Sequence, residues 1–222
     1  MPSYDDFIQK GWFKFPDHSE DVIMLDNFRA DPINSRLNTP SGKIEIFSET
    51  INSFGYDDCP GHPVWLEPCE WLGQKDKKYQ LHLISNQPKD KLHSQLDHGK
   101  FSRSNKVNGR EPVFINKNDA IKRNLKDKDL VQVYNDRGSC YASVVIDNNL
   151  RSGVILISTG AWYDPIDPSI NNSPCKNGNP NTLTPDKGTS SLAQGPIAHT
   201  CMVEIRLAEG EIPTVTAYDP PI

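Results

Sequence analysis

The side chains best suited to chemistry in this sequence are amides and hydroxyls gathered in one stretch, "KNGNPNTLTPDKGTSSLAQGP", residues 176–196. Amides pair a donor with an acceptor, as the edges of heterocycles do. Hydroxyls and the backbone N–H groups around glycine bind phosphate oxygens. The stretch therefore suits a large, flat, polar ligand that carries phosphate, with an ordinary turn-forming surface loop as the alternative.

A second polar stretch, "SNQPKDKLHSQLDHGKFSRSNKVNGRE", covers residues 85–111. His93 stands there among amide and hydroxyl side chains, and it is either a ligand-facing or a loop-packing histidine. Loops longer than about 12–15 residues are uncommon unless they are functional or disordered. Apolar anchors are few in 86–110 and 160–196, so we expect the fixed shape of both loops to depend on a ligand.

Other site chemistries lack their sequence signatures. The histidines form neither H-x-x-x-H nor H-E-x-x-H, and no cysteine pair has C-x-x-C spacing. There is no G-x-S-x-G elbow for a nucleophile and no G-x-G-x-x-G or P-loop for a nucleotide. We therefore expect no catalytic residue and no metal ligand from this chain, and the five cysteines are interpreted as idle or buried thiols: Cys59, Cys69, Cys140, Cys175 and Cys201.

The composition of the chain argues against further classes of protein, such as general nucleic-acid scaffolds and membrane-spanning proteins. The formal net charge is -5, whereas a general nucleic-acid scaffold has a basic excess. No apolar run approaches the roughly 18–20 residues of a membrane span, and the first residues, "MPSYDDFIQKGW", do not resemble a signal peptide. Hydrophobic residues make up 36% of the chain, which is enough to bury a core.

The elements that must position the polar loops begin at Lys78. Alternating or continuous apolar runs predict short strands, and polar cap residues predict a helix of about two turns in "NKNDAIKRN", 116–124. Residues 129–147 are predicted to form a hairpin around "RGS". This pattern is typical of a closed all-β barrel. The predicted strands are "KYQLHLIS" (78–85), "EPVFIN" (111–116), "DLVQVYND" (129–136), "CYASVVID" (140–147), "SGVILIS" (152–158) and "HTCMVEIRL" (199–207).

Residues 1–76 differ in composition from the rest of the chain, with many prolines and aromatic residues and little hydrophobic periodicity. One strand is predicted there, in "GKIEIFS", 42–48. So many aromatic residues with so little regular structure indicate a segment that packs against a partner surface, part of which lies outside this chain.

Several long motifs resemble the molybdopterin-dependent S- and N-oxide reductases, the dimethyl sulfoxide reductase family, in its biotin sulfoxide and trimethylamine N-oxide reductase branch. They are "SNQPKDKLHSQLDHG", "STGAWYDP" and "GNPNTLTPDKGTSSLAQGP" in the second half, and "TPSGKIEIFSETI", "FGYDDCPGHPVW" and "EWLG" upstream. The resemblance covers nearly the whole chain. It implies a six-stranded double-psi β-barrel at 77–222 that binds molybdopterin guanine dinucleotide, preceded by an irregular linking segment at 1–76.

The resemblance also implies which residues line the cofactor. In the first loop they are Ser85, Asn86, Gln87, Leu92, His93, Ser94 and Gln95. In the second they are Asn177, Gly178, Asn179, Asn181, Gln194 and Gly195.

The same resemblance implies a C-terminal fragment of a larger enzyme, because the family's molybdenum ligand and substrate pocket belong to upstream domains. We expect the parent to hold bis(molybdopterin guanine dinucleotide) molybdenum, to reduce a small S-oxide or N-oxide, and to be periplasmic or alternatively cytoplasmic. The fragment alone should be inactive. A stand-alone barrel that binds a partner without redox chemistry is the alternative.

Overall fold

The computed structural model describes residues 1–16 and 21–220. Residues 17–20 of the expected segment 1–76, and 221–222 of the expected domain 77–222, lie outside this description. The chain divides into two compact units, one of residues 1–54 with 61–63, the other of residues 55–60 with 64–222. The domain boundary expected near residue 76 stays a prediction.

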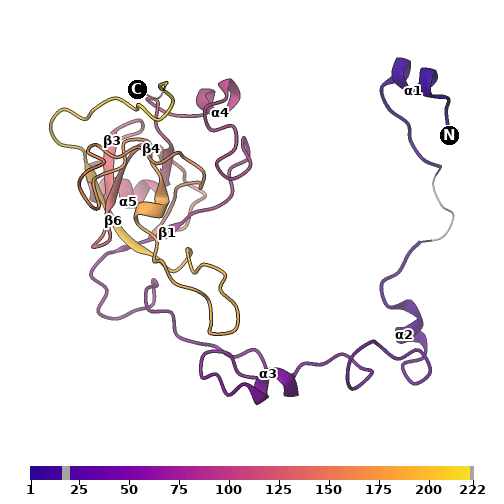
Figure 1. The fold of residues 1–222 in the computed structure, drawn as a ribbon. Helices are drawn as coiled ribbons and strands as arrows, with labels where there is room; N and C mark the ends of the chain where they lie inside the picture. The colour runs from indigo at the N-terminus through magenta and orange to yellow at the C-terminus, as the bar shows by residue number, and fades with distance from the viewer. Residues whose placement is uncertain (17–20, 221–222) are drawn as a thin grey trace. The chain divides into compact units, whose positions relative to one another are not determined.

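The second unit is built around a closed barrel with strand order β1-β5-β2-β4-β3-β6 (Figure 1). The predicted six-stranded barrel is confirmed, and each predicted strand of 78–207 coincides with an observed one. The strands are β1 Leu81–Ile84, β2 Pro112–Ile115, β3 Leu130–Tyr134, β4 Ser139–Ile146, β5 Val154–Leu156 and β6 Met202–Leu207.

Alternation of side chains places the core inside this barrel. Val131 and Val133 of β3 are fully buried, and their register partners in β4 are Ala142 and Cys140. Burying a Val, Leu or Ile side chain contributes about 1.5–3 kcal/mol. The hydrophobic core therefore follows directly from the period-two pattern of the sequence.

Mixed pairing decides where the polar loops emerge. β1 and β5 are parallel, with His82 opposite Val154 and Ile84 opposite Leu156. The carboxyl ends of both strands consequently lie at the same end of the barrel. Residues 85–97, which follow β1, and 157–164, which follow β5, start side by side.

The second unit also contains short helices. The predicted helix is confirmed as α5 Lys117–Lys122, in which the Asn116 side chain caps the N-terminus by accepting from Asn118 N. Two elements within the long loops were not predicted, α4 Lys100–Ser104 and the 3₁₀ turn η1 Pro180–Thr182. Both are single turns, which leave little periodicity to detect.

The first unit contains α1 Tyr4–Lys10, α2 Asp26–Ala30 and α3 Glu49–Ser53. The strand predicted in 42–48 is wrong, since no strand forms there and Ile44 and Ile46 are 66% and 80% exposed. A strand requires a ladder partner, and the described residues of this unit supply none. Alternation alone therefore gave a false signal.

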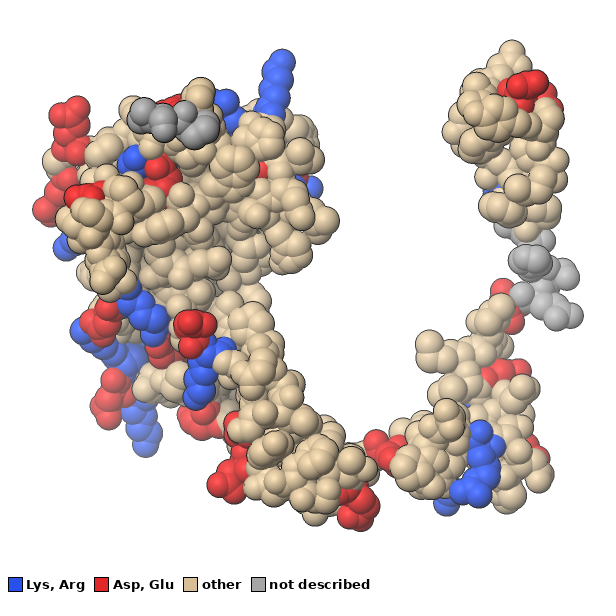
Figure 2. Space-filling view, viewed as in Figure 1, with Lys and Arg blue, Asp and Glu red and all other residues tan. Residues whose placement is uncertain are grey.

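Charged side chains of both signs are mixed on the surface of the barrel unit, on the face that Figure 2 shows. Within residues 1–16 and 21–220, the structure contains no helix with the length and apolar character that crossing a membrane requires.

Candidate cofactor-binding site

The two polar loops meet at the carboxyl ends of β1 and β5. Thr159 N donates to Asn86 O at 2.9 Å, and Ser158 Oγ donates to Asn86 Oδ1 at 3.0 Å. Asn86 is thus held from both its backbone and its side chain by the loop that follows β5. The parallel pairing of the strands extends into the loops.

Two hydroxyls at this junction lack partners. Ser85 Oγ and Thr159 Oγ1 are buried, and neither has a hydrogen-bond partner among residues 1–16 and 21–220. A buried hydroxyl without a partner costs about 1–3 kcal/mol. A buried polar atom without a partner calls for an explanation, such as a ligand, an ion or an ordered water.

The "LHSQ" turn lies next to this junction. Gln95 N donates to Leu92 O at 2.9 Å, and His93 adopts a left-handed φ of 50°. Gln87 Nε2 lies 3.2 Å from His93 Nδ1. The side chains of Leu92, His93 and Gln95 are exposed, so this strained turn presents polar groups outward.

Gly160 allows the two loops to approach each other this closely. Its φ is 98°, and a Cβ atom placed on it would lie 1.8 Å from His93 O. Any side chain at residue 160 would push the "LHSQ" turn away from the β5 loop.

Asp97 ties the loops together beneath that turn. Its Oδ2 accepts from Trp162 N at 3.0 Å and from Tyr218 Oη at 2.8 Å. Lys91 and Lys106 make ion pairs with its Oδ1 at 2.9 and 3.1 Å. Burial works to raise the pKa of Asp97, but the bond from Trp162 and the two lysines outweigh it and lower that pKa to about 2.

Trp162 bridges the same loops a second time, because its Nε1 donates to Ser94 O at 2.8 Å. Asn177 is drawn into this network and is fully buried. Asn177 Nδ2 donates to Trp162 O at 3.0 Å, and Asn177 Oδ1 accepts from Tyr218 Oη at 3.3 Å. The Asn177 amide is therefore engaged inside the protein.

Asn179 and Asn181 lie in a cavity of about 670 Å³. Asn179 Oδ1 accepts from Asn181 N at 2.9 Å and caps η1, which leaves the Asn179 NH₂ group as a free-standing donor among the described residues. The cavity wall is mostly amides and hydroxyls, a donor set that suits a polar heterocycle. Other lining residues are Arg137, Gly138, Tyr163, Asn172, Ser173, Thr182, Thr184 and Asp186.

Arg137 anchors one side of this cavity. Its guanidinium makes two bonds to the Glu70 carboxylate, at 2.5 and 2.9 Å, and its Nε donates to Leu183 O at 2.6 Å. The paired bonds to Glu70 raise the pKa of Arg137 above its already high value, and the reciprocal contacts lower the pKa of Glu70 against the effect of burial. The bond from Arg137 to Leu183 ties the end of the η1 turn to the turn that precedes β4.

Gln194 and Gly195 lie elsewhere. They belong to a small hairpin in which Thr189 N donates to Gly195 O at 2.8 Å and Ile197 N donates to Lys187 O at 3.1 Å. Gln194 Nε2 is bonded within that hairpin, to Ser190 O at 2.9 Å. Of the predicted site residues, the structure thus brings the first-loop set together with Asn177 and keeps Gln194 and Gly195 in a separate element.

Four residues that sequence reasoning did not assign prove central to the arrangement: Asp97, Thr159, Trp162 and Tyr218. Asp97, Thr159 and Trp162 lie in quoted motifs, so their roles were within reach of the sequence. Tyr218 follows the last strand by 11 residues and carried no sequence signal.

The comparison with protein families decides what such a site is for. Residues 81–202 match the model described as the Molydopterin dinucleotide binding domain, and this range spans more than half of the chain. The chain belongs to this family.

Relatives match all or nearly all of the chain. It is 42% identical to the dimethyl sulfoxide/trimethylamine N-oxide reductase of Cereibacter sphaeroides over 100% of the chain and 27% of that protein. It is 44% identical to trimethylamine-N-oxide reductase 1 of Escherichia coli (strain K12) over 97% of the chain and 26% of that protein. The chain therefore spans about a quarter of the length of these relatives.

The molydopterin dinucleotide binding fold also recurs in a solved structure. Acetylene hydratase from Pelobacter acetylenicus aligns with a TM-score of 0.63 over 80% of this chain and 25% of that one. Sequence identity is 18%, so the likeness concerns the fold alone.

Proposed function

We propose that this domain holds the pterin and guanine arms of bis(molybdopterin guanine dinucleotide) molybdenum in a reductase of S-oxides or N-oxides. The observation that carries the proposal is the pair of unpartnered buried hydroxyls, Ser85 Oγ and Thr159 Oγ1, at the junction of the two loops. The matched relatives, whose names are those of dimethyl sulfoxide and trimethylamine N-oxide reductases, support the substrate class.

The residues present fit such a cofactor. Ser85 and Thr159 supply hydroxyls, and Gln87, His93 and Gln95 supply a rim of donors and acceptors. Asn179 and Asn181 supply amides in the cavity of about 670 Å³. Gln194 and Gly195 complete the proposed contact set, and Asn86, Leu92, Ser94, Asn177 and Gly178 shape the loops that carry it.

When bound, the cofactor supplies the two-electron redox chemistry. The overall reaction takes the oxide, two electrons and two protons to the sulfide or amine and water. This chain's own residues bind and orient the dinucleotide and keep the loops that enclose it in place. Selectivity for the oxide is assigned to parts of the parent outside this chain.

The first unit supports a larger parent protein. Val22, Met24, Ile33 and Ile46 are exposed there, and each is at least 80% accessible. Exposed apolar side chains in this number are consistent with burial against a partner. We propose that further domains of the same polypeptide cover it, and that the parent is periplasmic.

The cofactor proposal is tested in the full-length protein with two substitutions. Gln95→Ala removes an exposed amide beside the proposed ligand. Asn179→Asp keeps the oxygen that caps η1 but removes the NH₂ donor. Each should lower the molybdenum and guanine content of purified protein, because a lost bond to a buried ligand group costs about 1–3 kcal/mol.

Gln80→Ala is the matched control, since Gln80 is exposed at the opposite end of β1. Molybdenum and guanine contents at the wild-type level in both test variants would contradict the contacts. Contents that fall equally in the control would indicate a general loss of folding instead.

The isolated 222-residue chain is proposed to have no reductase activity. Turnover of trimethylamine N-oxide or biotin sulfoxide with reduced viologen, above that of a buffer blank, would contradict this. The same assay with the full-length protein should show turnover, and a full-length protein that binds the cofactor without turnover would favour a binding module.

A further inference from the structure

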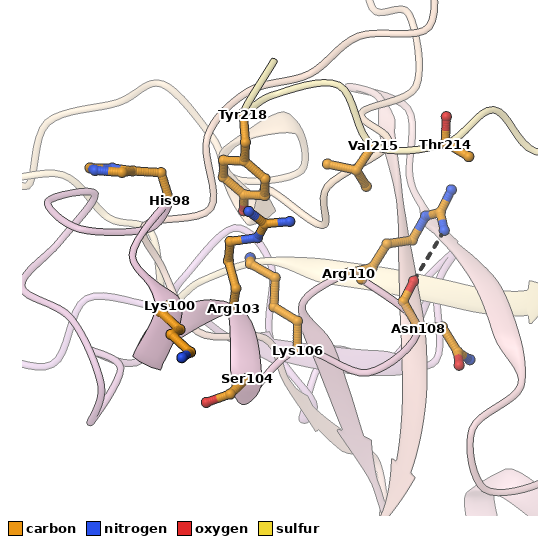
Figure 3. A pocket seen from close by; sticks show the side chains of 11 residues that line it. His98, Lys100, Arg103, Ser104, Lys106, Asn108, Arg110, Thr214, Val215 and Tyr218 are labelled. Atoms are coloured by element: carbon orange, nitrogen blue, oxygen red, sulfur yellow. Dashed lines mark hydrogen bonds between the residues drawn. The ribbon is translucent and has the colours of Figure 1, made fainter. Parts of the chain in front are cut away.

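A second cavity, of about 650 Å³, lies between α4 and the C-terminal segment 213–218 (Figure 3). Its wall carries four cationic side chains and no carboxylate among the described residues. The cations are Lys100, Arg103, Lys106 and Arg110. The chain as a whole has a net charge of -5, so this concentration of positive charge runs against its composition.

The carboxylates beneath the cavity balance Lys106, but among the described residues they form no ion pair with Arg103 or Arg110. Asp97 and Glu111 balance Lys91 and Lys106, with Lys106 Nζ at 3.1 and 3.4 Å from their oxygens. Asp164 lies within electrostatic range of Arg110, but it pairs with Lys176 at 3.1 Å. Its oxygens also accept from Thr216 N at 2.7 Å and Ala217 N at 3.1 Å.

Two buried cationic groups in this wall are incompletely bonded. The Lys106 side chain is 1% exposed, and its Nζ has no hydrogen bond of good geometry within residues 1–16 and 21–220. Arg110 is 7% exposed and its Nε is likewise without a partner. The remaining Arg110 nitrogens reach only carbonyl groups, Pro213 O at 2.6 Å and Asn108 O at 3.5 Å. Buried donors of this kind are rare without a ligand.

The cationic side chains line two neighbouring parts of the cavity wall. In Figure 3, Arg103 and Lys106 rise from the α4 side toward the Tyr218 ring, and Arg110 points toward Thr214 and Val215. Arg103 lies 5.2 Å and Lys106 lies 5.9 Å from the Tyr218 ring centroid. Lys100 points away from both parts and adds only long-range charge.

We infer that this cavity binds a phosphate group, either as the free ion or as part of a nucleotide. A phosphate dianion matches Arg103 and Arg110 in charge, because Lys106 is already paired with Asp97 and Glu111. Its oxygens also match the forked donors of a guanidinium. A monocarboxylate would leave one of the two arginines uncompensated.

The test is calorimetric titration of the holoprotein with inorganic phosphate at constant ionic strength. Arg103→Gln should weaken phosphate binding about tenfold, the effect of losing one charged hydrogen bond. Arg206→Gln is the matched control because Arg206 is also exposed and also stacks on a tyrosine, with its guanidinium 4.9 Å from the Tyr134 ring. The control should bind phosphate as the wild type does.

Absence of saturable binding in the wild type would overturn the inference, as would equal binding by both variants. Displacement of phosphate by an equal concentration of acetate would also overturn it. Titration with GMP distinguishes the sources, since tighter binding of GMP than of phosphate identifies a nucleotide and weaker binding identifies the free ion. Molybdenum content of the same samples reports the proposed cofactor function separately.

Discussion

Tyr218 Oη donates a hydrogen bond of 2.8 Å to Asp97 Oδ2, joining residues that are 121 positions apart. The bond fastens the C-terminal segment across the base of the first polar loop. Burial raises the pKa of Tyr218, and the adjacent Asp97 carboxylate raises it further, so the hydroxyl stays protonated as a donor. A residue outside every strand thus positions the loops of the candidate site.

Tyr218→Phe should destabilise the protein by about 1–3 kcal/mol, because the buried Asp97 carboxylate loses the donor that lies 2.8 Å from it. Urea unfolding monitored by circular dichroism measures this change. Tyr163→Phe is the control, since Tyr163 is exposed. Equal unfolding midpoints for Tyr218→Phe and the wild type would show that the bond contributes nothing.

The Asp97 carboxyl should titrate with a pKa of about 2, below its ordinary value of 3.8. Because the pKa of Asp97 is lower in the folded protein than in the unfolded protein, the carboxylate stabilises the fold at pH values above the unfolded-state pKa. This stabilisation is lost as the pH falls through the folded-state pKa. The stabilisation is roughly 2 kcal/mol and should disappear between about pH 4 and pH 2. Carbon-13 NMR of the carboxyl group measures the titration midpoint. A midpoint near pH 4 would show that the hydrogen bonds and ion pairs of Asp97 do not lower its pKa.

Thiol reactivity should separate the five cysteines into two classes. Cys140, Cys175 and Cys201 are buried, whereas Cys69 is exposed and Cys59 is half-buried. Burial raises the pKa of Cys140 far above its usual range and, against the effect of Arg137, raises the pKa of Cys201 to about 11. Ellman's reagent at pH 8 should therefore react with Cys59 and Cys69 in the folded chain and with all five after denaturation. Reaction of a third thiol before unfolding would contradict the packing.

Amide exchange should divide the second polar loop. Cys175 N donates to Ser139 O at 3.0 Å and Tyr141 N donates to Cys175 O at 2.8 Å, so residue 175 is hydrogen-bonded to β4 on both sides. Leu183 is fully buried, but residues 189–196 are largely exposed. Slow exchange is expected at 175–183 and fast exchange at 189–195, because opening an exposed hairpin costs little free energy. Uniform rates across both parts would contradict this division.

The barrel was predictable because its signal is local. The alternation in β3 and β4 and the polar cap at Asn116 depend only on neighbouring residues, and each predicted an element that the structure contains. The prediction of a strand at 42–48 was wrong because strand formation also depends on a partner that is not local in the sequence. Alternation states which side chains share a face, but a strand exists only where another strand pairs with it.

The composition of the polar loops indicated ligand recognition, and the long motifs indicated which family performs it. The expectation that the loops depend on a ligand for their shape stays a prediction. A count of apolar residues misses anchors such as Asn177 and Asp97, which are polar and buried. Asn177 was expected to line the cofactor, which stays a prediction, and in the structure its amide is hydrogen-bonded to Trp162 and Tyr218.

Tertiary structure alone decided which groups remain free for a ligand. Parallel pairing of β1 with β5 places Ser85 and Thr159 at the same end of the barrel, where neither hydroxyl has a partner among the residues that the structure describes. The return of the C-terminal segment closes a cationic cavity over Arg110. Residue types and local periodicity specify the strands and the polar loops, whereas long-range hydrogen bonds determine which polar atoms are already satisfied, and no local pattern encodes those distances.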